Sequence, residues 1–121
     1  YCDEELAKQS RHGGLIAPPL FYMAPLTEPV PESELRPDGL PYEGRFPIPP
    51  TSLPRLMDGG TEIEFFVPIR VGDTLTARSK IVDIYQKEGR SGLLIFVVRE
   101  TRYSNQHNAL VLIEKGASIL R

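Results

Sequence analysis

The fold of this chain is decided by residues 64–75, which read EFFVPIRVGDTL. Apolar and polar side chains alternate up to Val67, as in a strand with one buried face. Pro68 cannot donate a backbone hydrogen bond to a strand ladder, so a strand should end there. Gly72 and Asp73 are turn residues, and β-forming residues follow them. The stretch therefore predicts a strand, a corner and a second strand.

The length and composition fit a single domain spanning residues 1–121. With 14 basic and 16 acidic residues the formal net charge is −2, which indicates neither nucleic acid nor an anionic membrane as partner. The lone cysteine, Cys2, excludes an intramolecular disulfide and fits a cytoplasmic location. No apolar run approaches the roughly 20 residues of a membrane span, and no signal peptide is visible. Because the chain begins at Tyr1 without methionine, we expect further residues before it.

Two helices are predicted in the first part of the chain. The first spans residues 3–10, because its acidic start suits the positive end of a helix and a glycine pair follows it. The second begins at Pro18 or Pro19, where the missing N–H costs nothing, and runs to Ala24. Its residues are apolar all round, and a helix without a polar face is usually buried. We therefore expect it at the centre of the fold.

Residues 25–59 are rich in proline and lack periodicity, and all 12 prolines lie at or before Pro68. We predict a long loop here, with one helical turn near residues 31–35. Loops of this length in compact domains are commonly lids or linkers. Two aromatic residues within residues 41–47 leave two interpretations open. The segment packs against the domain, or it covers a binding groove or a partner.

The second half of the chain predicts an antiparallel meander. Strands are expected at residues 61–67, 74–86, 93–103 and 109–120, with turns at residues 88–92 and 104–108. The strands change from alternating to continuous apolarity, so the sheet should curve around something buried on one face. Phe96 and Val98 are expected to be neighbours of the Leu20-Phe21 helix.

Two segments resemble the MaoC-like hydratase/dehydratase family. One is the pattern F-x-x-P-I-x-x-G-D-T-L at residues 65–75, and the other combines YCDEELA at residues 1–7 with GGLIAPP at residues 13–19. The resemblance implies an α+β hotdog fold, in which a curved antiparallel sheet wraps around a central apolar helix. It also implies that hotdogs pair as a double hotdog and that the first strand lies before residue 1.

The resemblance further implies a chemistry, from which this chain departs. In that family a carboxylate and a histidine activate water, and a backbone N–H at the start of the central helix binds the thioester oxygen. Here Tyr1 stands at the position of the histidine, and the carboxylate would lie before it. The family's I-A-H-G becomes Ile16-Ala17-Pro18-Pro19, and Pro19 has no N–H. We expect no catalytic residue in this chain, as in the non-catalytic N-terminal half of fatty-acid-synthase-type dehydratases.

Such a half would shape the acyl pocket. The resemblance implies that the wall of this pocket contains Pro18, Leu20, Phe21 and Met23. Contacts to CoA or pantetheine are expected just before the helix, from His12, Gly13 and Gly14. The alternative for His12 is a solvated loop position.

The other polar residues give weaker indications of a binding or catalytic role. His107 lies in a turn beside asparagines and is interpreted as structural. Arg99 and Arg102 either meet CoA phosphates or face water beside Glu100. No Cys/His cluster has metal-ligand spacing, and no glycine-rich phosphate loop follows a strand, so neither metal nor cofactor is expected. The second helix carries no carboxylate, which counts against a thioesterase.

Two functions remain open. The first is a component of an (R)-specific enoyl-thioester hydratase or 3-hydroxyacyl-thioester dehydratase, the acyl-binding half that needs a catalytic partner. The second is a non-enzymatic acyl-CoA binding or assembly subunit. Both imply an acyl-CoA or acyl-carrier-protein thioester as ligand and a second hotdog domain as partner.

Overall fold

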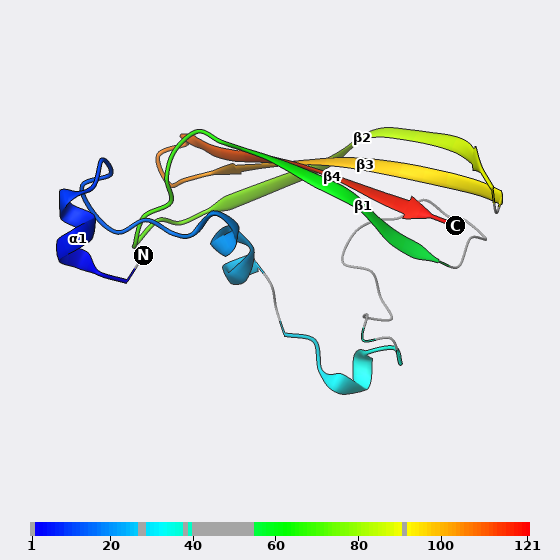
Figure 1. The fold of residues 1–121 in the computed structure, drawn as a ribbon, viewed down its shortest axis with the longest axis horizontal. Helices are drawn as coiled ribbons and strands as arrows, with labels where there is room; N and C mark the ends of the chain where they lie inside the picture. The colour runs from blue at the N-terminus through cyan, green and yellow to red at the C-terminus, as the bar shows by residue number, and fades with distance from the viewer. Residues whose placement is uncertain (1, 27–28, 38, 40–54, 91) are drawn as a thin grey trace.

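The computed structural model describes residues 2–26, 29–37, 39, 55–90 and 92–121. It contains an antiparallel four-stranded sheet with the strand order β1-β4-β3-β2 (Figure 1). The strands are β1 (Leu56–Phe65), β2 (Thr76–Gly89), β3 (Gly92–Ser104) and β4 (Leu110–Leu120). The helical segments are α1 (Glu4–Gln9) and the two 3-10 helices η1 (Pro19–Leu26) and η2 (Glu32–Glu34). Among the described residues, no helix is long and apolar enough to cross a membrane.

The four predicted strands are present, although their ends differ. β1 begins at Leu56, inside the predicted loop of residues 25–59, and ends at Phe65 rather than Val67. The pairing of β1 with β4 shifts between residues 58 and 61. There Gly60 adopts a φ of +102° and donates its N–H to Asp58 Oδ1 over 2.9 Å. This glycine bulge interrupts the alternating pattern, which is why sequence reasoning missed the first half of the strand.

The loop prediction is tested only at its margins. η2 lies where one helical turn was expected, near residues 31–35. The aromatic segment at residues 41–47 lies outside the described residues.

The corner after β1 has the predicted form. The N–H groups of Phe66 and Val67 both donate to the carbonyl of Val111, over 2.9 and 3.3 Å, and the ladder stops at Pro68. Gly72 has a φ of +87°, a left-handed conformation that favours glycine. The chain therefore leaves one edge of the sheet at Pro68 and rejoins the sheet at its other edge as β2.

The face of the sheet that η1 contacts contains most of the buried core. Tyr22 of η1 packs with Tyr103, Val111 and Leu112, and the partly buried Ile63, Ile69 and Leu75 surround them. The Tyr22 ring meets the Tyr103 ring edge-on at 4.9 Å and the Phe65 ring at 6.4 Å. This cluster fixes η1 near the end of the sheet at which the corner lies.

The expectation of a central helix buried all round is wrong. Tyr22 is 1% exposed, but Leu20, Phe21 and Met23 are 61%, 57% and 50% exposed. The segment is a 3-10 helix that touches the sheet from one side. Apolar composition alone does not distinguish a helix inside a core from a segment along its margin.

The expected contact of this segment with Phe96 and Val98 is also wrong. Alternate residues of a strand point to opposite faces, so both lie on the face opposite to Tyr103. Phe96 is half-buried and stacks on Tyr85 with a centroid distance of 4.8 Å. The apolar run of β3 supplies both faces of the sheet, which the continuous pattern could not resolve.

Candidate functional site

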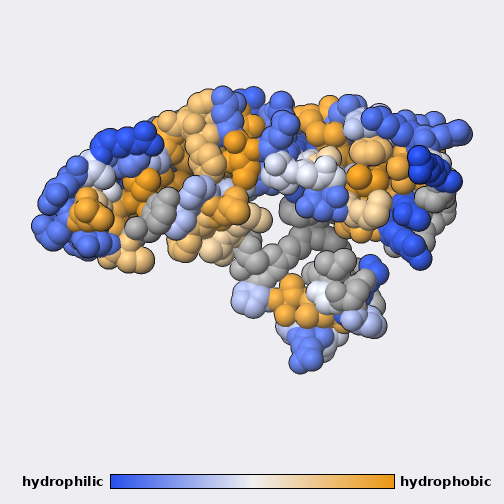
Figure 2. Space-filling view, in the orientation of Figure 1, coloured by the Kyte–Doolittle hydropathy of each residue, from blue (hydrophilic) through white to orange (hydrophobic). Residues whose placement is uncertain are grey.

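A groove of about 440 Å³ lies between the segment before η1 and the corner after β1. It is lined by Arg11, His12, Ile16, Ala17, Pro18, Pro19, Phe65, Phe66, Val67, Pro68 and Ile69. One wall thus comes from each of the two segments that resemble the same family. Apolar side chains gather where η1 lies against the sheet (Figure 2). The groove has apolar walls and a basic residue at its rim.

Backbone contacts hold the two walls together. Ile16 forms an isolated antiparallel bridge with Arg70, and the N–H of Ala17 donates to the carbonyl of Ile69 over 2.8 Å. The Arg70 side chain adds a third link, because its Nη2 donates to the carbonyl of His12 over 2.7 Å. The segment of residues 12–17 is therefore attached to the corner at both ends.

The corner is in turn fixed to the β3–β4 hairpin through Asp73. Its carboxylate accepts the N–H of Arg70 over 2.8 Å and the amide of Gln106 over 3.1 Å. The Gln106 side chain also accepts the N–H of Thr74 over 3.0 Å. Two hydrogen bonds lower the pKa of Asp73. The larger effect comes from the backbone N–H of Arg70 and the smaller from the side-chain amide of Gln106. The Gly-Asp pair of the family pattern therefore positions Arg70, and through it one wall of the groove.

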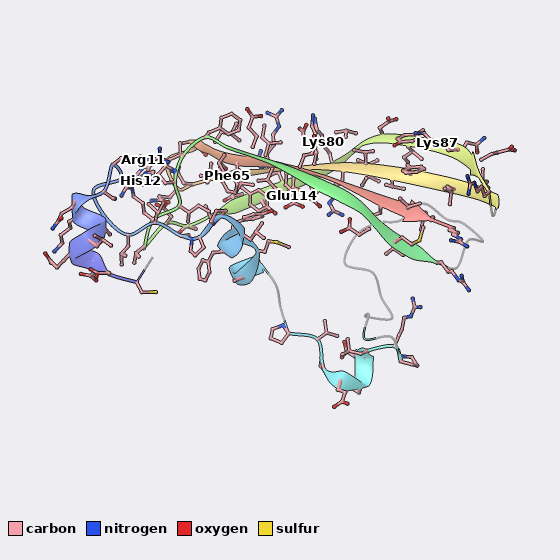
Figure 3. The ribbon with its side chains drawn as sticks, in the orientation of Figure 1. Arg11, His12, Phe65, Lys80, Lys87 and Glu114 are labelled. Carbon is pink, nitrogen blue, oxygen red and sulfur yellow. The ribbon has the colours of Figure 1, made fainter. Side chains whose placement is uncertain are left out.

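The rim of the groove contains a contact between Arg11 and His12, which lie together beside α1 (Figure 3). The Nε of Arg11 donates to the Nε2 of His12 over 3.2 Å. An imidazole that accepts at Nε2 carries its ring proton on Nδ1. The rim therefore presents the Arg11 guanidinium beside the His12 ring.

Residues 17–19, which form a lip of the groove just before η1, offer no free backbone N–H. The N–H of Ala17 is used by Ile69, and Pro18 and Pro19 have none. The carbonyl of Pro18 accepts the N–H of Phe21 over 2.9 Å, which begins η1. A thioester oxygen at this lip would find no preorganised N–H from these residues.

Sequence reasoning missed a polar cluster beneath η1. The hydroxyl of Tyr22 donates to Glu114 Oε2 over 2.6 Å, and that of Tyr103 lies 3.4 Å from the same oxygen. Burial, and then the Glu114 carboxylate, raise the pKa of both phenols, that of Tyr103 to about 12. The sequence signal for this cluster was Glu114, a single glutamate on the η1-facing side of a largely apolar strand.

The predicted binding residues fall into three groups. Pro18 and His12 line the groove, and Gly14 lies beside the Arg70 guanidinium. Gly13, with a φ of +65°, makes the turn that follows α1. The exposed Leu20, Phe21 and Met23 lie outside the groove lining.

The remaining polar candidates lie away from the groove. Arg102 donates to Glu100 over 2.9 Å on the opposite face of the sheet, and Arg99 lies on the η1-facing side of β3. His107 donates its N–H to Asn105 in the β3–β4 turn, as expected of a structural residue. Within the described ranges no three His, Cys, Asp or Glu residues are placed to hold a metal ion.

Comparison with protein families places these features in context. A family model described as "FAS1-like, dehydratase domain region" matches residues 1–114. Mesaconyl-C(4)-CoA hydratase of Chloroflexus aurantiacus is 37% identical over 103 residues, which make up 85% of this chain and 36% of that protein. The chain therefore spans about a third of the length of this relative.

Solved structures show the same fold. The MaoC-like dehydratase from Rhodospirillum rubrum has a TM-score of 0.61 at 24% identity, covering 98% of this chain and 70% of that one. A chain of the ChsH1-ChsH2 complex from Mycobacterium tuberculosis has a TM-score of 0.71 at 15% identity, covering 99% and 67%. The monoamine oxidase regulatory protein from Archaeoglobus fulgius has a TM-score of 0.66 at 19% identity, covering 100% and 70%. The α+β hotdog prediction is confirmed.

Proposed function

This chain belongs to the FAS1-like dehydratase-region family, of the MaoC type of hydratases and dehydratases, and we propose that it is an acyl-binding half without the catalytic dyad. The observation that carries the proposal is the groove between residues 11–19 and 65–69. Its walls are apolar, its rim is basic, and its lip at residues 17–19 has no N–H to offer. Such a groove suits binding of a thioester better than its activation.

From its rim to its walls, the groove offers contacts suited to the phosphate, the pantetheine and the acyl group of an acyl thioester. The Arg11 guanidinium at the rim can form charge-assisted hydrogen bonds with a phosphate of CoA or of a carrier-protein arm. His12, Gly13 and Gly14 stand beside it for contacts to the pantetheine. The apolar walls, among them Pro18 and Phe66, would exclude water from the pantetheine and from the acyl group.

Hydration of a conjugated enoyl thioester needs a general base and acid near the two carbons and a donor for the developing enolate oxygen. We assign these groups to a second hotdog domain, in the same polypeptide or in a partner subunit. The exposed Leu20, Phe21 and Met23 are then available to complete the acyl pocket at the junction between the two domains. This chain binds and orients the substrate, and its partner moves the protons.

The alternative is a non-enzymatic acyl-CoA binding or assembly subunit. One experiment separates the two: hydration of crotonyl-CoA by this chain alone and by the complete protein with its native partner. The proposal predicts no hydration by the chain alone and hydration by the complete protein. Hydration by the chain alone would contradict a half without the dyad. Tight binding of crotonyl-CoA by the complete protein without turnover would favour the alternative.

A further inference from the structure

The buried side chain of Tyr22 anchors η1 to the sheet. Among the η1 residues whose side chains are described, 19–24, Tyr22 is buried and the others are exposed. Its ring packs between Phe65 and Tyr103, and its hydroxyl donates to Glu114 over 2.6 Å. Tyr22 thus holds η1 against the sheet, in addition to the hydrogen bond from Ala17 to Ile69 that fixes the chain just before η1.

Tyr22 also adjoins the acyl groove. Phe65 lines the groove and contacts the Tyr22 ring, while Pro18 and Pro19 line it immediately before η1. Figure 3 shows Glu114 on the sheet close to η1, with Phe65 nearer the corner. Pro18 and Pro19 therefore lie between two attachments, the Ala17–Ile69 hydrogen bond before them and the buried Tyr22 ring after them.

Glu114 restricts the position of Tyr22 by accepting its hydroxyl. It lies on β4, directly opposite Ile63 of β1 and Thr101 of β3, and is therefore held by ladders on both sides. Its Oε2 receives the Tyr22 hydroxyl, with the Tyr103 hydroxyl at the longer distance of 3.4 Å. A phenol–carboxylate hydrogen bond is short and strong compared with a neutral one.

We propose that Glu114 and Tyr22 are positioning residues that set the width of the acyl groove, by fixing η1 and the proline lip at one distance from Phe65. The inference rests on the proposed acyl-binding function and adds to it the residues that determine affinity for the acyl group. Neither side chain is among those that line the groove. Loosening this link therefore weakens substrate and transition state alike, which raises KM and leaves kcat unchanged.

The test uses the complete protein and a series of trans-2-enoyl-CoA substrates of increasing chain length. Tyr22→Phe removes the hydroxyl and keeps the ring, and Glu114→Gln removes the charge and keeps the shape. Each should raise KM by about tenfold while kcat stays within about twofold, the pattern of lost uniform binding. Tyr103→Phe should raise KM by less, because its hydroxyl is at the longer distance. Tyr85→Phe and Glu62→Gln, on the opposite face, are the matched controls and should leave KM unchanged.

A combined variant separates the positioning effect from the effect on the free energy of unfolding. Removing both partners of a buried hydrogen bond restores stability better than removing one. In Tyr22→Phe/Tyr103→Phe/Glu114→Leu, which also removes the Tyr103 hydroxyl that lies 3.4 Å from the Glu114 carboxylate, the free energy of unfolding should recover while KM stays raised. A KM that recovers together with stability, or a KM unchanged in both single variants, would overturn the inference. If Tyr22→Phe does not fold, Glu114→Gln and Tyr103→Phe still decide the matter.

Phe66→Ala, in the groove wall away from Tyr22, distinguishes the two proposals. If it raises KM and the variants of Tyr22 and Glu114 do not, the acyl groove stands and the positioning role fails. If Phe66→Ala also leaves KM unchanged, the acyl-binding function fails and the positioning role falls with it.

Discussion

The guanidinium of Arg70 donates to the backbone carbonyl of His12 over 2.7 Å, across 58 positions of sequence. This contact joins the two segments that carry the family resemblance, and it does so at the rim of the groove. Asp73 holds the backbone of Arg70 on the other side. The rim is thus supported by the corner and by the turn that the sequence pattern singled out.

Replacing Arg70 by Ala should loosen the rim without unfolding the domain. Loss of one hydrogen bond at an exposed site costs about 1 kcal/mol of unfolding free energy. We expect KM for crotonyl-CoA to rise by about threefold to tenfold with kcat nearly constant. Steady-state kinetics and urea denaturation of the complete protein measure both effects. Arg78→Ala, an exposed arginine of β2, is the control, and an equal effect from both substitutions would argue against a role for the rim contact.

The core can be probed with two adjacent aromatic residues of opposite burial. Tyr22→Ala removes a ring that is 1% exposed, and it should cost about 3–5 kcal/mol, a large part of the roughly 5–15 kcal/mol available to a domain. Phe21→Ala removes a ring that is 57% exposed, so it should lower the free energy of unfolding of this chain, measured without a partner, by less than about 1 kcal/mol. Denaturant unfolding curves decide. Equal costs would mean that η1 lies elsewhere.

Alkaline pH should weaken the cluster beneath η1. The pKa of Tyr103 is raised from 10.0 to about 12, by burial and then by the Glu114 carboxylate. Burial also raises the pKa of Tyr22. The neutral phenols therefore contribute their full stability below the unfolded pKa of 10.0, and this contribution is lost as pH rises from 10.0 to about 12 and beyond. Urea unfolding at a series of pH values should show this loss in the parent and a smaller one in Tyr22→Phe/Tyr103→Phe. Equal loss in both proteins would mean that these phenols are not the cause.

Pairing of hotdog domains should be visible in solution. β1 is an edge strand of the sheet, and Leu20, Phe21 and Met23 are exposed. Unpaired edges and exposed apolar residues need a partner, so we expect an interface of well over about 1,000 Å² in total. Sedimentation of the complete protein measures its association state. A stable monomer with a single hotdog domain per polypeptide would be the contrary result.

The sheet was predictable because its signals are local. Alternation and turn residues located the four strands, and Pro68 with Gly72 and Asp73 located the corner. The beginning of β1 was missed because Gly60 breaks the alternation at a bulge.

The groove was only partly predictable. Pro18 was proposed from the family pattern and His12 from its place just before the second helix, but their meeting with Phe66 depends on contacts between distant segments. The burial of η1 could not be read from composition, since an apolar segment looks the same at the centre of a core and at its margin. Likewise, the hydrogen bond that Glu114 accepts comes from Tyr22, which lies 92 positions away in the sequence.

The central claim is that this chain binds the thioester and transfers no proton. The most direct test measures crotonyl-CoA hydration by the complete protein carrying both Tyr1→Phe and His12→Ala. The family resemblance predicts that Tyr1 stands at the position of the catalytic histidine, and His12 lines the groove. The account predicts that kcat falls by less than about tenfold while KM rises, because no proton passes through either side chain. A fall in kcat of about a hundredfold or more, the usual result of losing a general acid or base, would contradict it.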